Sequence, residues 1–260
     1  MLKLAKGIEG LLIQLGTSGI FLLTSLSRAV FPPYSVYPYI KQIYFIGARS
    51  LLVILLSGTF VGMVVALQFH DTLVRFGSVS LLGSAVGLSL IRELGPVLTA
   101  LMVIGRAGSA ICAEISIMRN EQQIDALECM AIDPYRYLIA PKIVAGIISV
   151  PLLTVIFIVV GIFGGYFVGV ILFNVSPGAY FHGMYDTVLW NDIKMGLVKS
   201  IIFGLIIVWI ATTRGFYLHE FMQKNETYGS EGISRVTTDS VVLSSITILC
   251  FDYLISALIL

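Results

Sequence analysis

Five long apolar runs constrain the fold of this chain more than any other feature. A helix that crosses a bilayer needs about 20 consecutive, mainly apolar residues. The runs that meet this requirement cover residues 43–69, 81–104, 143–173, 195–213 and 240–260. The sequence therefore predicts an all-α, polytopic integral membrane protein with five transmembrane helices. No linker or repeat divides the runs, so residues 1–260 are expected to form one domain.

The composition agrees with a chain that has hydrocarbon as its solvent. Hydrophobic residues make up 57% and charged residues 12% of the chain, whereas about 25% charged residues is usual in soluble domains. The mean hydropathy is +0.96. A net charge of +1, without a basic patch interleaved with aromatic residues, excludes nucleic acid as a partner. The three cysteines lack metal-ligand spacing, so no metal site is expected.

The loops differ in lysine and arginine content, which predicts the orientation of the chain in its membrane. Three segments are rich in basic residues: Lys3, Lys6, Arg28 and Lys41 before the first run, Arg106, Arg119, Arg136 and Lys142 between the second and third, and Arg214, Lys224 and Arg235 between the fourth and fifth. The other two loops hold little positive charge. In a bacterial inner membrane, the N-terminus is therefore expected in the cytoplasm and the C-terminus in the periplasm.

The first 40 or so residues precede the first predicted span. Residues 2–30 mix apolar positions with Lys3, Glu9, Gln14 and Arg28. This pattern is typical of an amphipathic helix that lies along a membrane surface. The alternative is an additional membrane span, which the glycines, Gln14 and scattered serines disfavour.

Glycines recur at intervals of four residues in two of the runs. Gly58 and Gly62 form one such pair, and Gly161, Gly165 and Gly169 continue the pattern in the third run. Small residues four apart let helices approach closely in lipid. Internal packing is the expected role, and a subunit interface on the third run is the alternative.

Two charged residues, Arg92 and Glu93, lie inside the second run. Arginine at the centre of a bilayer costs at least about 2.5–3.5 kcal/mol, and neighbouring residues on a helix point about 100° apart. The two side chains therefore need partners on other helices, or a wet cavity. Pro96 also frees a backbone carbonyl one turn earlier, near Arg92. The residues either form a polar network that fixes helix packing or serve a cavity in transport.

Lys199 and Asp252 are the other intramembrane charges. Both are predicted in the outer half of the membrane, in the fourth and fifth runs. Their depths are compatible with an ion pair, whereas snorkelling of Lys199 to the membrane surface is the competing interpretation.

Residues 121–131, in the basic loop after the second run, form a short amphipathic pattern. Apolar and acidic positions fall on adjoining faces at helical spacing. This helix either rests on the membrane surface or docks in a groove of a cytoplasmic partner. The residues expected to make that contact are Glu121, Ile124, Asp125, Leu127, Glu128 and Met130.

Enzyme motifs are missing from the sequence. It has no GxxxxGK[ST] loop for ATP, no GxSxG, and an HExxH pattern that fails at its second histidine. No catalytic residues are therefore expected, and the charged membrane-embedded positions favour a transport permease. An intramembrane lipid-modifying enzyme and a secondary transporter that needs no ATPase are the alternatives.

Several blocks of the sequence together form a recognisable pattern: the segments 92–96 (Arg-Glu-Leu-Gly-Pro), 105–110 (Gly-Arg-Ala-Gly-Ser-Ala), 113–119, 128–134 and 232–238, together with Asp252. These blocks resemble the MlaE/YrbE family of permeases. The similarity extends from about residue 40 to the C-terminus. Mild departures occur at Cys129 and Ile132.

The resemblance implies a homodimeric permease of an ABC system that transports phospholipid and maintains outer-membrane lipid asymmetry. Its expected partners are a cytoplasmic ATPase of the MlaF type, which binds ATP and Mg, a STAS-domain subunit of the MlaB type and a periplasmic MCE-domain hexamer of the MlaD type. The chain itself is expected to hold no cofactor. The helix at 121–131 would couple to the ATPase. Arg92 and Glu93 would lie at or beneath an outward-facing cavity, with Lys199 as the expected headgroup contact.

Overall fold

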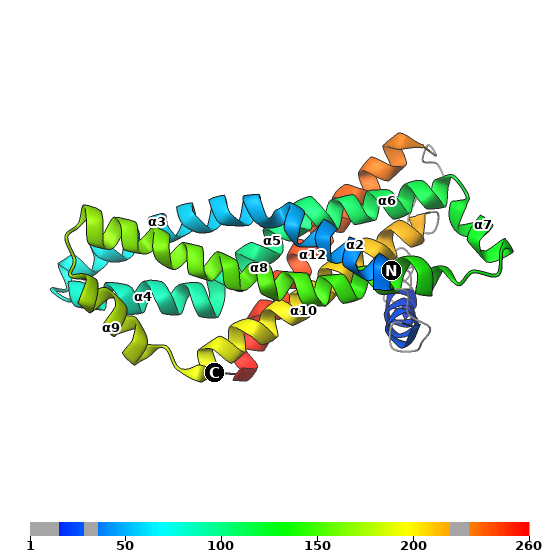
Figure 1. Ribbon diagram of the computed structural model, residues 1–260. Coiled ribbons are helices and arrows are strands. Elements are labelled where there is room, and N and C mark those ends of the chain that lie inside the picture. The colour runs from blue at the N-terminus through cyan, green and yellow to red at the C-terminus, as the bar shows by residue number, and fades with distance from the viewer. Residues whose placement is uncertain (1–15, 29–35, 219–228, 260) are drawn as a thin grey trace, which may run out of the picture.

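The computed structural model describes residues 16–28, 36–218 and 229–259, and within these ranges the chain is helical and has no strand. Five helices are long and apolar enough to cross a membrane (Figure 1). They cover Val36–Arg75, Val79–Asn120, Tyr135–Leu172, Trp190–Phe216 and Ser230–Ile259. The predicted all-α fold with five membrane spans is thereby confirmed.

Each span is built from one or more helical segments. The first contains α2 (Val36–Ile46) and α3 (Leu51–Arg75), the second α4 (Leu82–Ser89), α5 (Gly95–Val103) and α6 (Ser109–Asn120), the third α8 (Ala140–Tyr166), the fourth α10 (Trp190–Phe216) and the fifth α12 (Ser230–Ile259). Two short helices, α7 (Gln123–Cys129) and α9 (Pro177–Thr187), lie between spans.

The second span extends much further than its apolar run. The sequence predicts an end at residue 104 and places Arg106 and Arg119 in a loop, but the helix continues to Asn120. That prediction was wrong because an apolar run reports the thickness of the hydrocarbon layer, whereas backbone hydrogen bonding can continue a helix into water.

Four segments of the spans are π-helical, at Leu90–Leu94, Ile104–Gly108, Tyr135–Ile139 and Phe167–Leu172. The first of them directly precedes Gly95 and Pro96, and the Gly95 amide bonds to the Leu90 carbonyl five residues earlier. Such π segments are frequent at functional sites, because they turn side chains away from the register of a continuous α-helix. Two of the four lie in the second span, on either side of α5.

The glycine repeats pack α3 against α8. A Cβ atom on Gly62 would overlap the backbone of Gly161, and one on Gly164 would overlap the carbonyl of Thr59. All the third-span glycines of the repeat are buried within the chain. They therefore serve internal packing, which leaves them no surface for a second subunit.

The N-terminal segment is helical over residues 16–28, and the rest of the predicted 2–30 helix falls outside the described residues. Phe21 is buried and its ring lies 5.3 Å from that of Tyr135 and 5.5 Å from that of Phe216. Ile20 and Leu23 are 67% and 70% exposed. In Figure 1 this blue helix runs steeply across the long helices at the end that carries α7.

The three segments predicted to be cytoplasmic gather at one end of the bundle. The N-terminal helix, α7, the end of α10 and the start of α12 lie there, whereas α9 and the turn from α3 to α4 lie at the opposite end (Figure 1). The end of α12 lies beside the start of α10.

Candidate translocation site

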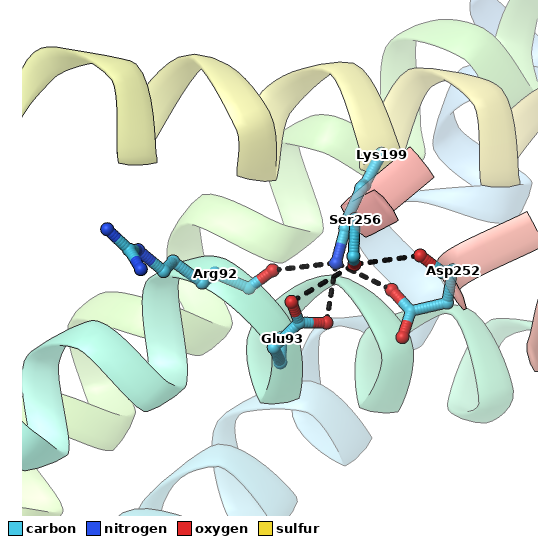
Figure 2. Close-up of polar contacts among 5 residues, drawn as sticks. All are labelled: Arg92, Glu93, Lys199, Asp252 and Ser256. Atoms are coloured by element: carbon cyan, nitrogen blue, oxygen red, sulfur yellow. Dashed lines mark hydrogen bonds and ion pairs between the residues drawn. The ribbon is translucent and has the colours of Figure 1, made fainter. Parts of the chain in front are cut away.

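Lys199 lies at the centre of a cluster that joins three spans. Its side chain is fully buried, and its Nζ lies 2.5 Å from Glu93 Oε2 and 2.8 Å from Asp252 Oδ1 (Figure 2). The contact to Glu93 is a hydrogen bond, whereas the contact to Asp252 is an ion pair outside hydrogen-bond geometry. Of the two interpretations that the sequence left open for Lys199, the ion pair with Asp252 is present. The snorkelling interpretation is wrong, because the ammonium is enclosed by protein oxygens.

A backbone carbonyl supplies the third contact of this ammonium. Lys199 Nζ donates to the Arg92 carbonyl over 3.1 Å. Pro96 stands four residues after Arg92 and has no N–H, so it cannot make the usual α-helical bond to this carbonyl. The freed carbonyl that the sequence predicted thus has a partner, and this partner is a charged side chain from another span.

The fifth span contributes a further contact through Ser256, one turn after Asp252. Its hydroxyl lies 3.1 Å from Glu93 Oε1, so both carboxylate oxygens of Glu93 have partners on other spans. We call Glu93, Lys199, Asp252 and Ser256 the polar cluster. Two carboxylates face one ammonium, so the polar cluster has a formal charge of −1. The side chain of Glu93 is 41% exposed, so the cluster opens to the surface of the chain.

Arg92 points away from the polar cluster, although its carbonyl belongs to it (Figure 2). Its guanidinium contacts Asp192 through Nη2 at 2.6 Å and Nε at 2.8 Å. The other oxygen of Asp192 accepts the backbone amide of Leu189 over 2.9 Å, at the start of α10. Asp192 therefore ties the π segment of the second span to the N-terminus of the fourth.

The role of Asp192 was not predicted, because the residue lies in the loop before the fourth apolar run, 195–213. The available signal was an acidic residue in the first turn of a helix, where a carboxylate can accept unpaired backbone amides. The expectation that Arg92 and Glu93 need partners on other helices is correct for both residues.

An apolar cleft of about 1260 Å³ lies between α9 and the start of α10, and it is lined by the chain neighbours of Arg92 and Asp192, Ile91 and Ile193. Its lining residues are Ile91, Pro177, Gly178, Phe181, His182, Met184, Tyr185, Val188, Trp190 and Ile193. Tyr185 is 85% and Trp190 65% exposed. The ammonium of Lys194 lies 5.9 Å from the centre of the Trp190 ring. The cleft thus combines apolar and aromatic walls with positive charge beside them.

The helix α9 is held over this cleft by Tyr180. Its ring is fully buried, and its hydroxyl donates to the Ile162 carbonyl over 3.1 Å. Burial raises the pKa of the Tyr180 hydroxyl, so it remains a hydrogen-bond donor at physiological pH. Gly83 packs directly against the backbone of Tyr180, which fixes α9 on α4.

The predicted coupling helix is shorter than residues 121–131. It runs from Gln123 to Cys129, after Gln122 in the left-handed backbone region. Ile124, which was predicted to contact a partner, is fully buried. That prediction was wrong for Ile124, because a helix of this length needs an apolar anchor on its own chain.

The other predicted coupling residues occupy different positions around α7. Asp125 pairs with Arg119 over 2.7 Å, and Leu127 is partly buried. Glu121 and Glu128 are exposed. Met130 is 61% exposed and follows the end of the helix. The surface left open around α7 is therefore acidic, with one methionine beside it.

Comparison with known proteins gives one consistent answer. The family model described as Permease MlaE matches residues 39–258. The intermembrane phospholipid transport system permease protein MlaE of Haemophilus influenzae is 44% identical over 220 residues, which cover 84% of this chain and 81% of that protein. A probable ABC transporter permease protein of Rickettsia bellii is 40% identical over 99% of this chain and 98% of its own length. The chain belongs to the MlaE permease family.

Proposed function

We propose that this chain is the membrane-spanning permease subunit of an ABC transporter that moves phospholipid between the bacterial inner membrane and a periplasmic MCE-domain protein. Such transport would maintain the lipid asymmetry of the outer membrane. The observation that carries the proposal is a charged cluster that joins three spans around the buried Lys199, with an apolar cleft beside the same π segment. The phospholipid named for the relative from Haemophilus influenzae supports the choice of substrate.

The cleft and its neighbouring charges suit the two ends of a phospholipid. The apolar walls between α9 and α10 would accept an acyl chain. The Arg92 side chain is 34% exposed and can offer its guanidinium to a phosphate. Lys199 is fully enclosed by the polar cluster, so we assign the headgroup contact to Arg92 instead. Glu93, Lys199 and Asp252 would then control how the second, fourth and fifth spans sit against each other.

The second span offers a continuous path from the proposed ATPase to this site. It is helical from Val79 to Asn120 and continues through a two-residue turn into α7. We propose that α7 docks in a cytoplasmic ABC ATPase of the MlaF type, which binds ATP and Mg. Closure of two ATPase subunits would move both copies of α7 in a permease homodimer. The second and fifth spans would shift and change the polar cluster.

Two further partners complete the proposed complex. They are a STAS-domain subunit of the MlaB type and a periplasmic MCE-domain hexamer of the MlaD type. The exposed apolar residues of α12, which is the least buried of the five spans, leave room for contacts to a second copy or to lipid.

Affinity purification of the tagged chain in mild detergent tests this proposal. Mass spectrometry should identify an ABC ATPase, an MCE-domain protein and bound phospholipid in the purified material. Recovery of the chain without ATPase and without lipid would contradict it. In that case, the polar cluster would need to be studied as an ion or proton site of a secondary transporter.

The proposed orientation can be tested through Cys129, which is exposed at the end of α7. We expect a membrane-impermeant maleimide to leave Cys129 unlabelled in intact spheroplasts and to label it after permeabilisation. Tyr185→Cys is the matched control, because this 85% exposed position lies on α9 at the opposite end. It should react in intact spheroplasts. Expression of the chain alone keeps partner proteins from shielding either position, and labelling of Cys129 before permeabilisation would reverse the orientation.

A further inference from the structure

The first span is broken between α2 and α3, and the break leaves backbone carbonyls without their α-helical partners. The amide of Ser50 bonds to Gly47 over 3.0 Å instead of to Ile46. The Ile46 carbonyl accepts the Ser50 hydroxyl over 2.7 Å. A buried carbonyl that loses its backbone partner must find another donor, and Ser50 solves this problem within its own span.

The carbonyl of Phe45 finds its donor on the second span. Arg106 Nη1 donates to it over 2.5 Å and to Ser50 Oγ over 3.0 Å. The guanidinium also lies 4.9 Å from the centre of the Phe45 ring. Arg106 therefore holds the break by a backbone, a hydroxyl and an aromatic contact, which its planar guanidinium with several N–H donors makes together.

The position of Arg106 on the second span connects this contact to α7. It lies in the π segment Ile104–Gly108, and α6 follows directly and leads to α7. A displacement of α7 along α6 would therefore reach Arg106 through one helix of twelve residues. At the break, α2 can change its angle to α3 without loss of α-helical hydrogen bonds, because the contacts of Ser50 and Arg106 already replace these bonds.

We propose that Arg106 is a positioning residue that transmits movement of α7 to the break between α2 and α3, and so couples ATP hydrolysis to rearrangement of the first span. The inference rests on the proposed function, since it assumes an ATPase that acts on α7. In this scheme, ATP hydrolysis drives a movement of the first span. Arg106 touches no substrate in this scheme and acts only through the first span.

The first experiment measures two rates on the whole reconstituted complex in lipid vesicles. For Arg106→Ala, we expect ATP-dependent phospholipid transfer to fall about tenfold while ATP hydrolysis stays within about twofold of the parent, because coupling mutations change transmission rather than the catalytic site. Arg106→Lys should transfer phospholipid at a rate between those of Arg106→Ala and the parent. Arg75→Ala is the control, because Arg75 is 74% exposed and pairs with Asp71 on its own helix. It should match the parent in both rates.

A parallel loss of hydrolysis and transfer in Arg106→Ala, or unchanged transfer, would overturn the proposal. If Arg106→Ala does not assemble, Arg106→Lys is tested by the distance between spin labels at Tyr37→Cys on α2 and Ile117→Cys on α6. Both positions are exposed, at 76% and 42%, and the exposed Cys129 and Cys250 are replaced by serine. Labelled chain is diluted with unlabelled chain, so that distances arise within one copy.

The parent complex should show a change in this distance when ATP is added, and Arg106→Lys should reduce that change. An equal ATP-dependent change in Arg106→Lys would exclude the coupling role and leave Arg106 as a structural contact. Failure of the proposed function has a different signature, since the parent complex itself would then show no ATP-dependent phospholipid transfer.

Discussion

Lys199→Met is expected to destabilise the protein by about 3 kcal/mol, at the lower end of the 3–5 kcal/mol typical when one partner of a buried ion pair is removed. The change leaves the carboxylates of Glu93 and Asp252 facing each other without a cation. Asp252 is 20% and Glu93 41% exposed on the side chain, which lets water reduce the cost. The Arg92 carbonyl, already without a donor from Pro96, also loses its partner. The measurement is the apparent melting temperature of the purified chain in detergent.

The matched variants separate packing from transport. Glu93→Gln with Asp252→Asn in the Lys199→Met background removes both uncompensated charges and keeps side chains of similar shape. It should recover most of the melting temperature, because neutral side chains carry a much smaller burial cost than charges. Phospholipid transfer should be lost both in Lys199→Met and in this triple variant. Recovery of transfer together with stability would mean that the polar cluster only fixes helix packing, which is the alternative left open by the sequence.

The polar cluster was predictable in part because charges in apolar runs are costly. Arg92, Glu93, Lys199 and Asp252 stand out for that reason, and the similar depths of Lys199 and Asp252 suggested their pairing. The partner of Glu93 could not be derived, because it depends on which faces of three helices meet. Both residues lie in the π segment, where Glu93 contacts Lys199 and Arg92 contacts Asp192 at the start of α10.

The cleft and the break in the first span could not be predicted from the sequence for a related reason. Both depend on helix ends rather than on apolar content. Asp192 lies outside the predicted fourth run, and Gly47 interrupts the run 43–69, which the sequence predicts as one continuous helix. Ile124 shows a limit of apolar content as a signal. Its side chain suits either a groove of a partner or the core of its own chain, and only the packing shows that it is buried in its own chain.

The glycine repeat makes the other strong prediction. Gly62→Ala should destabilise the chain by about 1–3 kcal/mol, the range usual for overpacking. A Cβ at Gly62 would lie 2.6 Å from the carbonyl carbon and 2.8 Å from the Cα of Gly161. These are backbone atoms, so no side-chain rotation relieves the overlap and α3 must move away from α8. The helix preference of alanine over glycine returns only about 0.5–1 kcal/mol. The measurement is again the melting temperature in detergent.

Gly19→Ala is the control for this prediction, because Gly19 is also helical but a Cβ added there would meet no atom within 4 Å. It should leave the melting temperature unchanged or raise it slightly, since only the helix preference acts there. An equal response of the two variants would show that α3 and α8 can separate at little cost. Their close contact would then be a consequence of packing elsewhere in the bundle rather than its cause. A lower melting temperature in Gly62→Ala alone would instead show that the contact between Gly62 and Gly161 sets the position of α3 on α8, against which the second and fourth spans pack.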